Sequence, residues 1–400
     1  MNIGIDIRML GKKRTGDESV FFNIVKQLCS LEECTTRGDA KQSYITLFID
    51  ERPQEEIVRL QGKLGIEKQQ NVSIVMLPTS NAFLWNMWVL PQYLKKHPVD
   101  IYHTQYIVPL NLPRSIKVVT HIHDVSFCEY PQYISIKDRI FLRLLIPRSL
   151  RRADMIIAVS EFTKAEIIRF YKTPAEKIEV VYNGLADEFV STQEISKERL
   201  EEVRLKYNLP PTFVLYVGTL QPRKNIPSLI RAFALMQSEA KNEHVSLVIV
   251  GQRNGYHYDT TIDTTIEECA VSSLAYFPGY IDQQDLPILM RLASVFVFPS
   301  LYEGFGIPIL EAMSQSVPVI ASDIPVHREI AGDGAEYVDT HDLVKFSEVL
   351  YTMIIDDAKR AQLVSAGTNT IHQYTWHASA QRMLSIYTSL HPETIFRNEK

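Results

Sequence analysis

Two glutamates stand on either side of a short glycine-rich stretch. Glu303 directly precedes Gly304, Gly306 follows two positions later, and Glu311 stands eight positions after Glu303. Glycine lets the backbone approach a ligand closely, and Pro308 suits the first turn of a helix, whose start presents unpaired N–H groups that bind anions. With a carboxylate on each side to bind hydroxyls, the stretch fits a sugar, a diphosphate and a ribose in that order. By themselves, two glutamates at this spacing are equally typical of solvated surface charge.

A pair of cations stands in a similar position earlier in the chain. Residues 212–217 form an apolar run that predicts a buried strand, Gly218 ends it, and Arg223 and Lys224 precede a helix predicted from residue 226. A guanidinium is a forked donor and an ammonium is a point charge, so the two together suit one anion. An Arg-Lys pair is usually surface decoration, but ligands of α/β sheets gather where strands end, which favours an anion site here.

Both stretches resemble motifs of one enzyme family. Glu303-x7-Glu311 resembles the paired-glutamate motif of retaining nucleotide-sugar glycosyltransferases of family 4, which have the GT-B fold, and Arg223-Lys224 matches their diphosphate-binding pair. The resemblance covers nearly the whole chain, and residues 218–225 are similar to those of mannosyltransferase-like members. It implies that the donor is bound by the following residues: Gly218, Arg223, Lys224, Tyr280, Glu303, Gly304, Phe305, Gly306, Ile307, Pro308, Ile309 and Glu311.

The resemblance also implies a role for each charged residue. Arg223 and Lys224 bind the diphosphate, and Glu311 binds the ribose hydroxyls. Glu303 and His123 contact the transferred sugar, so His123, Glu303, Arg223 and Lys224 form the expected catalytic set. Cations and a helix start stabilise the negative charge that develops on a departing diphosphate. The chain has no Asp-x-Asp, so we expect neither a metal nor any other cofactor.

A second constellation, His121-x-His123-Asp124, ends the strand predicted over residues 116–124. Histidines at i and i+2 share one strand face, so a zinc pair of the kind found in hydrolases is one interpretation. No clear set of further ligands follows it. The family resemblance instead places His123 at the donor sugar and leaves His121 as a packing residue, with Asp124 and Gly16 as acceptor-side candidates.

The loop after the first predicted strand departs from the family pattern. In the resembling enzymes this loop is rich in glycine, whereas here residues 12–14 are Lys, Lys and Arg, and only Gly16 follows them. Acidic residues at 17 and 18 stand where a P-loop would need Lys and Ser or Thr, which excludes a nucleoside triphosphate site of that kind. An acceptor-binding loop and a solvated surface loop both remain open.

Short apolar runs alternate with helical patterns in both halves of the chain, which predicts two doubly wound α/β units. We expect an α/β protein of GT-B type, with two Rossmann-like domains facing across a cleft that binds the nucleotide sugar. The acceptor-side domain spans residues 1–190 and the donor-binding domain residues 191–374, and by resemblance the tail 375–400 crosses back to the first domain as a helix. Ser160 is the expected N-cap of a helix over residues 161–171.

Composition limits the partners and the location. A net charge of −5 and a pI near 6.2 over 400 residues argue against a nucleic-acid partner. No apolar run approaches the roughly 20 residues that span a bilayer, and the N-terminus is charged too early for a signal peptide. Four sparse cysteines fit reduced thiols. These features predict a cytoplasmic protein.

Two apolar stretches allow more than one interpretation. Trp85 and Trp88 have helical spacing, and core packing is favoured over sugar stacking or membrane contact. Residues 137–152 form a basic amphipathic pattern that Pro147 interrupts. A solvated helix face and peripheral contact with anionic lipid at the inner membrane face are both open.

Together these features predict a retaining, metal-independent glycosyltransferase that moves a hexose from a GDP- or UDP-sugar to a glycan or lipid-linked acceptor, with GDP-mannose favoured. One alternative is a non-catalytic module that binds a sugar nucleotide. Another is a zinc-dependent hydrolase that uses His121 and His123. A third, a retaining glycoside hydrolase with Glu303 and Glu311 as its carboxylate pair, leaves the Arg-Lys pair without a task.

Overall fold

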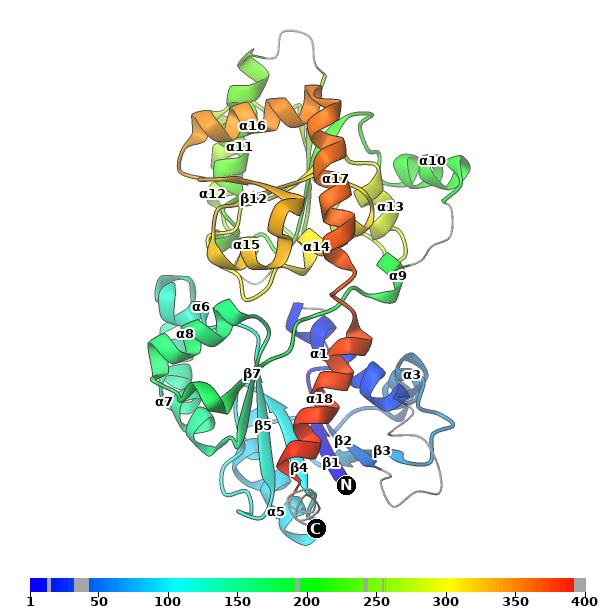
Figure 1. Ribbon diagram of the computed structural model, residues 1–400, viewed down its shortest axis with the longest axis vertical. Helices are drawn as coiled ribbons and strands as arrows, with labels where there is room; N and C mark the ends of the chain where they lie inside the picture. Colours follow the sequence, from blue (N-terminus) through cyan, green and yellow to red (C-terminus); the bar gives the residue numbers. More distant parts are fainter. Residues whose placement is uncertain are drawn as a thin grey trace, which may run out of the picture. The chain divides into compact units, whose positions relative to one another are not determined.

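The computed structural model describes residues 1–12, 16–31, 43–190, 195–239, 244–253, 255 and 257–391. Lys13 and Arg14 of the first loop therefore lie outside the described residues. The chain divides into two compact units, shown in Figure 1. Unit 1 contains residues 1–125, 134–184 and 375–400, and unit 2 contains residues 126–133 and 185–374. The chain thus enters unit 2 twice and returns to unit 1 with its last helix.

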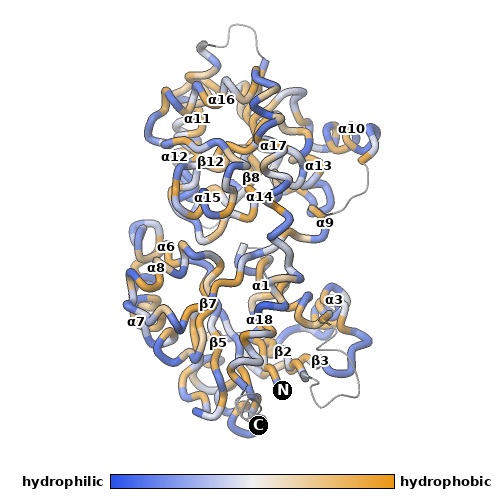
Figure 2. The backbone as a smooth tube through the Cα atoms, in the orientation of Figure 1, coloured by the Kyte–Doolittle hydropathy of each residue, from blue (hydrophilic) through white to orange (hydrophobic). Residues whose placement is uncertain are grey.

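Unit 1 is built on a parallel sheet that, within its described residues, has seven strands in the order β3-β2-β1-β4-β5-β6-β7. The strands are β1 (Asn2–Asp6), β2 (Tyr44–Asp50), β3 (Val72–Leu77), β4 (Ile101–Gln105), β5 (Lys117–Ile122), β6 (Met155–Ala158) and β7 (Ile178–Val180). The central strands are almost continuously buried, as a sheet covered on both faces requires, although β4 and β5 also carry buried polar residues such as His103 and His121. Orange segments near the labels β5 and β7 in Figure 2 mark apolar residues of this sheet.

Helices cover this sheet and close the unit. They are α1 (Gly16–Ser30), α3 (Gln54–Leu64), α4 (Ala82–Leu84), the π-helix η1 (Trp85–Val89), α5 (Leu90–Lys96), α7 (Ile136–Arg152), α8 (Glu161–Tyr171), the 3-10 helix η3 (Ala175–Lys177) and α18 (Trp376–Leu390). The predicted N-cap of α8 is confirmed, because the Ser160 hydroxyl accepts a hydrogen bond from the Thr163 amide at 3.0 Å. Helix α18 packs on α1, and its Tyr387 hydroxyl is hydrogen-bonded to His103 Nδ1 at 2.6 Å.

Unit 2 has a parallel sheet of six strands among its described residues, in the order β10-β9-β8-β11-β12-β13. The strands are β8 (Phe213–Val217), β9 (Ser246–Val250), β10 (Ala275–Tyr276), β11 (Val295–Phe298), β12 (Val319–Ser322) and β13 (Ala335–Val338). The helices are α6 (Ser126–Glu129), η2 (Pro131–Tyr133), α9 (Asp187–Val190), α10 (Lys197–Lys206), η4 (Pro222–Lys224), α11 (Ile226–Glu239), α12 (Thr261–Glu268), α13 (Leu286–Arg291), α14 (Ile307–Ser314), α15 (Pro325–Ala331), η5 (Gly332–Gly334), α16 (Leu343–Ile355) and α17 (Asp357–Ile371).

The core-packing prediction for the two tryptophans is half right. Trp85 is completely buried, and the Arg8 guanidinium lies 4.5 Å from its ring centroid. Trp88 is 64% exposed, so its placement in the core is wrong. The helical segment over 85–89 has π geometry rather than α geometry, so the i, i+3 spacing on which the prediction depended does not describe its faces.

Helix α7 differs from its prediction at Pro147. It runs without a break from Ile136 to Arg152 and passes through Pro147, which was expected to interrupt it. A proline inside a helix lacks its own N–H donor and its ring crowds the carbonyl group four residues earlier, but α7 is anchored on both sides of Pro147 by buried Ile146 and Leu150. Its other large apolar residues do not face the core, and this exposure bears on the function proposed below.

Candidate active site

The two central strands of the unit 2 sheet end beside each other. Strand β8 pairs in parallel with β11, and the chain proceeds from β8 outward to β9 and β10, and from β11 outward in the opposite direction to β12 and β13. The direction of winding therefore reverses between β8 and β11. Open α/β sheets bind their ligands at such a switch point, outside the carboxyl ends of the strands. The loops that follow Val217 and Phe298 occupy this position.

The two loops are joined by hydrogen bonds to main-chain carbonyl groups. The Leu301 amide donates to the carbonyl oxygen of Arg223 at 2.8 Å, and Arg223 Nη1 donates to the carbonyl oxygen of Tyr302 at 3.0 Å. Gly218 is required at the start of the first loop, because a Cβ there would lie 2.6 Å from the Tyr216 hydroxyl. The predicted cation pair and the predicted carboxylate motif are thus parts of one structure.

Glu303 lies between both predicted cations. Its Oε2 is 3.1 Å from Arg223 Nη1, and its Oε1 accepts a hydrogen bond from Lys224 Nζ. Lys224 and Glu303 are each only 7% exposed, and the ammonium lies 5.2 Å from the ring centroid of Phe298. Burial would raise the pKa of Glu303, but Lys224 and Arg223 lower it to about 2. The carboxyl group is therefore ionised at neutral pH.

Helix α14 begins directly after this cluster. Its N-cap is Gly306, whose φ of +107° is a conformation that residues with a Cβ rarely adopt. A proline occupies the first turn, as predicted, and the amides of that turn and the dipole of the helix favour an anion at its start. The structure thus places two cations and a helix start on one pair of adjacent loops, which suits a diphosphate.

The other predicted donor residues lie around these loops or farther along the same sheet edge. Glu311 is partly buried on α14, one turn beyond Ile307, and Phe305 is buried with its ring 5.7 Å from that of Tyr374. Gly304 and Ile309 are also buried. Tyr280 is 62% exposed after β10, where it is accessible to a ligand. Their roles toward the donor remain predictions.

The predicted residues of unit 1 lie at the carboxyl end of its own sheet. His123 follows β5, is 5% exposed, and donates from Nε2 to Gln105 Oε1 at 2.8 Å if Nε2 carries the proton. Burial lowers its pKa, and Asp17 and Asp124 oppose this effect. Asp124 is partly buried, with its amide 3.3 Å from the Tyr106 hydroxyl. Gly16 is the first residue of α1.

The zinc interpretation of the two histidines finds no support in their geometry. The rings of His121 and His123 are stacked, with centroids 4.6 Å apart and planes 18° from parallel, so their nitrogens do not converge on one point. His121 is completely buried, as expected for a packing residue. Within the described part of the chain, no group of three or more His, Cys, Asp or Glu side chains is arranged to hold a metal ion.

Comparison with known proteins decides the family. A family model described as "Glycosyl transferases group 1" matches residues 198–370, and one described as "Glycosyltransferase Family 4" matches residues 42–189. The O-antigen chain mannosyltransferase B of Escherichia coli is 32% identical over 300 residues, which cover 74% of this chain and 76% of that protein. The chain belongs to the family 4 glycosyltransferases.

One more relative and one solved structure are also similar to this glycosyltransferase. The O-antigen chain mannosyltransferase RfbU of Salmonella typhimurium is 31% identical over 239 residues, which cover 60% of each chain. The Anabaena protein Alr3699/HepE, solved in complex with UDP and glucose, superimposes with a TM-score of 0.70 at 18% identity over 97% of this chain and 100% of that one. The fold is GT-B, as the family resemblance implied.

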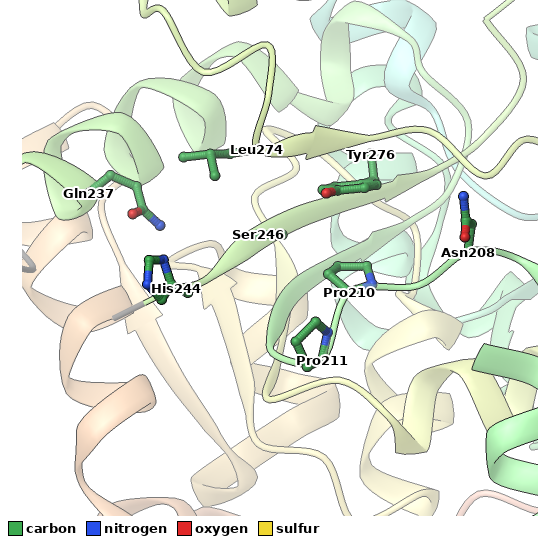
Figure 3. Close-up of a pocket in the computed structure, with 8 residues that line it drawn as sticks. All are labelled: Asn208, Pro210, Pro211, Gln237, His244, Ser246, Leu274 and Tyr276. Atoms are coloured by element: carbon green, nitrogen blue, oxygen red, sulfur yellow. The ribbon is translucent and has the colours of Figure 1, made fainter. Parts of the chain in front are cut away.

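Cavities of the glycosyltransferase also occur away from these loops. One of about 340 Å³ lies at the opposite, amino-terminal edge of the unit 2 sheet (Figure 3). It is lined by residues before β8, at the start of β9 and around the two-residue strand β10, with Gln237 from α11: Asn208, Pro210, Pro211, Gln237, His244, Ser246, Leu274 and Tyr276. None of these side chains carries a fixed charge, so the cavity does not suit a diphosphate.

Sequence reasoning missed two features of the site. It assigned Glu303 to the sugar and the cations to the diphosphate, and did not foresee that one carboxylate holds both cations. It also gave no role to His327, which is completely buried, with its ring 5.4 Å from that of Phe298. Local spacing gives no signal for such contacts, because Glu303 is 79 positions from Lys224 and His327 is 29 positions from Phe298.

Proposed function

We propose that this glycosyltransferase moves a mannosyl residue from GDP-mannose to a glycan or lipid-linked saccharide, with retention of configuration and without a metal ion. The observation that carries the proposal is the pair of cations, Arg223 and Lys224, held at the switch point of unit 2 beside the start of α14. The mannosyltransferase names of two relatives support mannose as the sugar. The retaining outcome follows from the family resemblance.

In this proposal unit 2 binds the donor and unit 1 carries the acceptor side. Arg223 and Lys224 contact the diphosphate together with the amides at the start of α14, and Glu311 binds the ribose hydroxyls. Glu303 and His123 orient the transferred sugar. Because Glu303 also fixes both cations, it positions the diphosphate contacts before the donor arrives.

The transfer breaks the bond between the anomeric carbon and a diphosphate oxygen, and the electron pair leaves with the diphosphate. An acceptor hydroxyl forms the new bond to that carbon, and its proton passes to the departing diphosphate. Fixed cations and helix dipoles stabilise the negative charge that develops on the leaving group. Two cations and one buried carboxylate leave one positive charge for this task.

The donor is tested by thermal unfolding in EDTA, with GDP, UDP, ADP and their sugar conjugates added separately. A ligand that binds only the folded protein raises the midpoint. We expect GDP and GDP-mannose to do so, while a shift with UDP alone would assign the base found in the Anabaena complex instead. No shift with any nucleotide would refute the diphosphate site. Transfer of labelled mannose to a saccharide acceptor then separates an enzyme from a module that only binds.

The acceptor side of the proposal includes peripheral contact with an anionic membrane surface. Four large apolar side chains of α7 are exposed: Ile136 by 76%, Ile140 by 56%, Phe141 by 47% and Leu144 by 68%. The same helix carries six Lys or Arg residues and one acidic residue, Asp138. A solvated helix face would be polar, whereas apolar side chains among cations match the boundary of anionic lipid. No helix within the described ranges is both long and apolar enough to cross a bilayer.

Co-sedimentation with vesicles of phosphatidylglycerol and phosphatidylcholine at low salt tests this contact. We expect binding that disappears on pure phosphatidylcholine and that weakens at least about tenfold in Ile140→Ser/Leu144→Ser, because two apolar side chains are lost from the lipid boundary. Val344→Ser removes an equally exposed apolar residue from α16 and should have no effect. Failure of the wild-type protein to bind anionic vesicles, or equal binding by the double variant, would rule the contact out.

A further inference from the structure

His327 of α15 connects the ends of the neighbouring strands β11 and β12 in unit 2. Its Nδ1 lies 3.0 Å from the carbonyl oxygen of Ser322, at the end of β12, and 3.1 Å from the hydroxyl of the same residue. A carbonyl oxygen only accepts, so Nδ1 carries the proton. The Ser322 hydroxyl in turn donates to the carbonyl oxygen of Ser300. The imidazole therefore anchors the hydroxyl that fixes Ser300.

Ser300 lies two residues beyond the end of β11, at the start of the loop that carries Glu303. The same ring also reaches the far end of that loop. A Cβ placed on Gly306 would lie 3.6 Å from His327 Cδ2, so the imidazole packs beneath the residue that caps α14. One buried side chain thus supports both ends of the segment 300–306.

We infer that His327 is a positioning residue for this loop: its Nδ1–H, acting through Ser322, holds Ser300, and its ring supports Gly306. The consequence for donor binding rests on the proposed function. The His327 side chain is completely buried, including Nε2, so it does not reach a surface at which a donor could bind. It acts by keeping Glu303, and with it the two cations, in a fixed position.

The neutral imidazole matches this role. Burial lowers the pKa of His327 to about 4, although the nearby Glu303 opposes the change. The groups that face the ring are the Ser322 hydroxyl and carbonyl, the Phe298 ring, and the charged pair Glu303 and Lys224. The Tyr337 hydroxyl lies 2.5 Å from the carbonyl oxygen of Gly332 and 3.3 Å from that of His327, so β13 contacts the backbone at the end of α15.

Hydrogen exchange of the ligand-free protein tests the inference without any donor. In His327→Phe, amides of residues 301–309 should exchange about tenfold faster than in the wild type, while those of β8 stay unchanged, because the lost hydrogen bond acts only on the loop. Ser322→Ala should shift the same amides in the same direction. Ser347→Ala, which removes another buried hydroxyl from unit 2, is the control and should leave the loop unchanged.

Rescue separates a positioning role from simple packing. Asparagine places an amide nitrogen near the position of Nδ1, and glutamine places one near Nε2, so His327→Asn should restore slow exchange and His327→Gln should not. Affinity for GDP should follow the same order, with about tenfold loss in His327→Phe. Unchanged exchange in His327→Phe, or rescue by glutamine alone, would overturn the inference. Faster exchange in a protein whose wild type binds no nucleotide would support the positioning role and refute the proposed function.

Discussion

Arg223 Nη1 lies 3.1 Å from Glu303 Oε2, and the other oxygen of the same carboxylate accepts from Lys224. A single buried carboxylate therefore holds both cations of the proposed diphosphate site. Without it, two adjacent cations would repel each other and turn toward solvent. The pair is presented to a ligand in a fixed geometry, which lowers the entropy cost of binding.

This relationship predicts how Glu303→Gln changes stability with pH. The two cations lower the folded pKa of Glu303 against the opposing effect of burial, from 4.5 to about 2. A lowered acidic pKa stabilises the folded state above the unfolded value and loses that effect as pH falls toward the folded value. We expect the variant to lose roughly 3 kcal/mol of unfolding free energy at pH 7.

Urea unfolding at pH 7, 5 and 3.5 measures this effect. The difference between wild type and Glu303→Gln should be constant from pH 7 to 5 and smaller at pH 3.5, where the unfolded wild type takes up the proton. Ser347→Ala again serves as a control in unit 2, since its effect should not depend on pH. A Glu303→Gln deficit that is the same at all three values would contradict an ion-pair origin.

The assigned roles predict different kinetic effects for two replacements. Glu311→Ala removes a hydroxyl acceptor on α14 and should raise the KM for the donor roughly tenfold, because a hydrogen bond to a charged group contributes about 1.5–3 kcal/mol. Lys224→Ala should mainly lower kcat, by roughly a hundredfold or more, because it removes stabilisation of the leaving group. Steady-state kinetics with saturating acceptor separates the two effects.

Lys224→Ala also leaves Glu303 short of a partner, so part of its effect is structural. The double variant Lys224→Ala/Glu303→Gln removes both charges and provides the control. The reference for kcat is Glu303→Gln alone, because Glu303 itself has a proposed role toward the sugar. If Lys224 serves only to neutralise Glu303, the double variant should have the same kcat as Glu303→Gln. If Lys224 contacts the diphosphate, the kcat of the double variant should be lower still. Normal kinetics in both Lys224→Ala and Glu311→Ala would remove the donor-site assignment.

The sequence predicted the strands that end at the site, and the residue types on the loops after them, because buried parallel strands are continuous apolar runs. It did not predict the contact between Glu303 and Lys224, which depends on β8 and β11 lying side by side. Trp88 was misplaced for a local reason, since α-helical periodicity was applied to a π-helical segment. Nor did any pattern indicate that residues 126–133 belong to the second unit, where Tyr130 packs with its ring centroid 6.0 Å from that of Tyr302.

Gly306 provides a test of the helix start. Its φ of +107° strains any residue with a Cβ, so Gly306→Ala should cost at least about 1 kcal/mol of stability and weaken nucleotide binding by displacing the first turn of α14. Gly16→Ala at the start of α1 is the matched control, because a Cβ there has no atom within 4 Å. Thermal unfolding with and without GDP measures both the loss of stability and the loss of nucleotide binding. Equal behaviour of the two variants would show that the conformation of Gly306 is not needed.

The histidines in the unit 1 core predict an acid-sensitive stability. Burial lowers the pKa of His103 to about 3 and lowers that of His121 far below its usual 6.5. At a pH below 6.5 but above the lowered pKa values of the folded protein, the unfolded chain binds protons that the folded chain does not. The free energy of unfolding therefore falls as pH drops below about 6.5, by up to about 1.4 kcal/mol per pH unit for each histidine. Among the described residues His121 has no hydrogen-bond partner at either ring nitrogen, so a leucine there loses no such bond.

His121→Leu should therefore be more resistant to acid than the wild type. Relative to its stability at pH 7, the variant should retain roughly 2 kcal/mol more than the wild type at pH 5, as measured by urea unfolding with a probe in unit 1 such as the buried Trp85. The exposed His377 of α18 supplies the control, since His377→Gln leaves the buried groups in place. A His121→Leu profile parallel to that of the wild type would mean that His121 takes up its proton in the folded protein as readily as in the unfolded chain. We would then expect the stacked ring of His123, whose centroid is 4.6 Å away, to take up a proton in the folded state as well. Acid would in that case change the proposed contact between His123 and the sugar rather than the stability of the core.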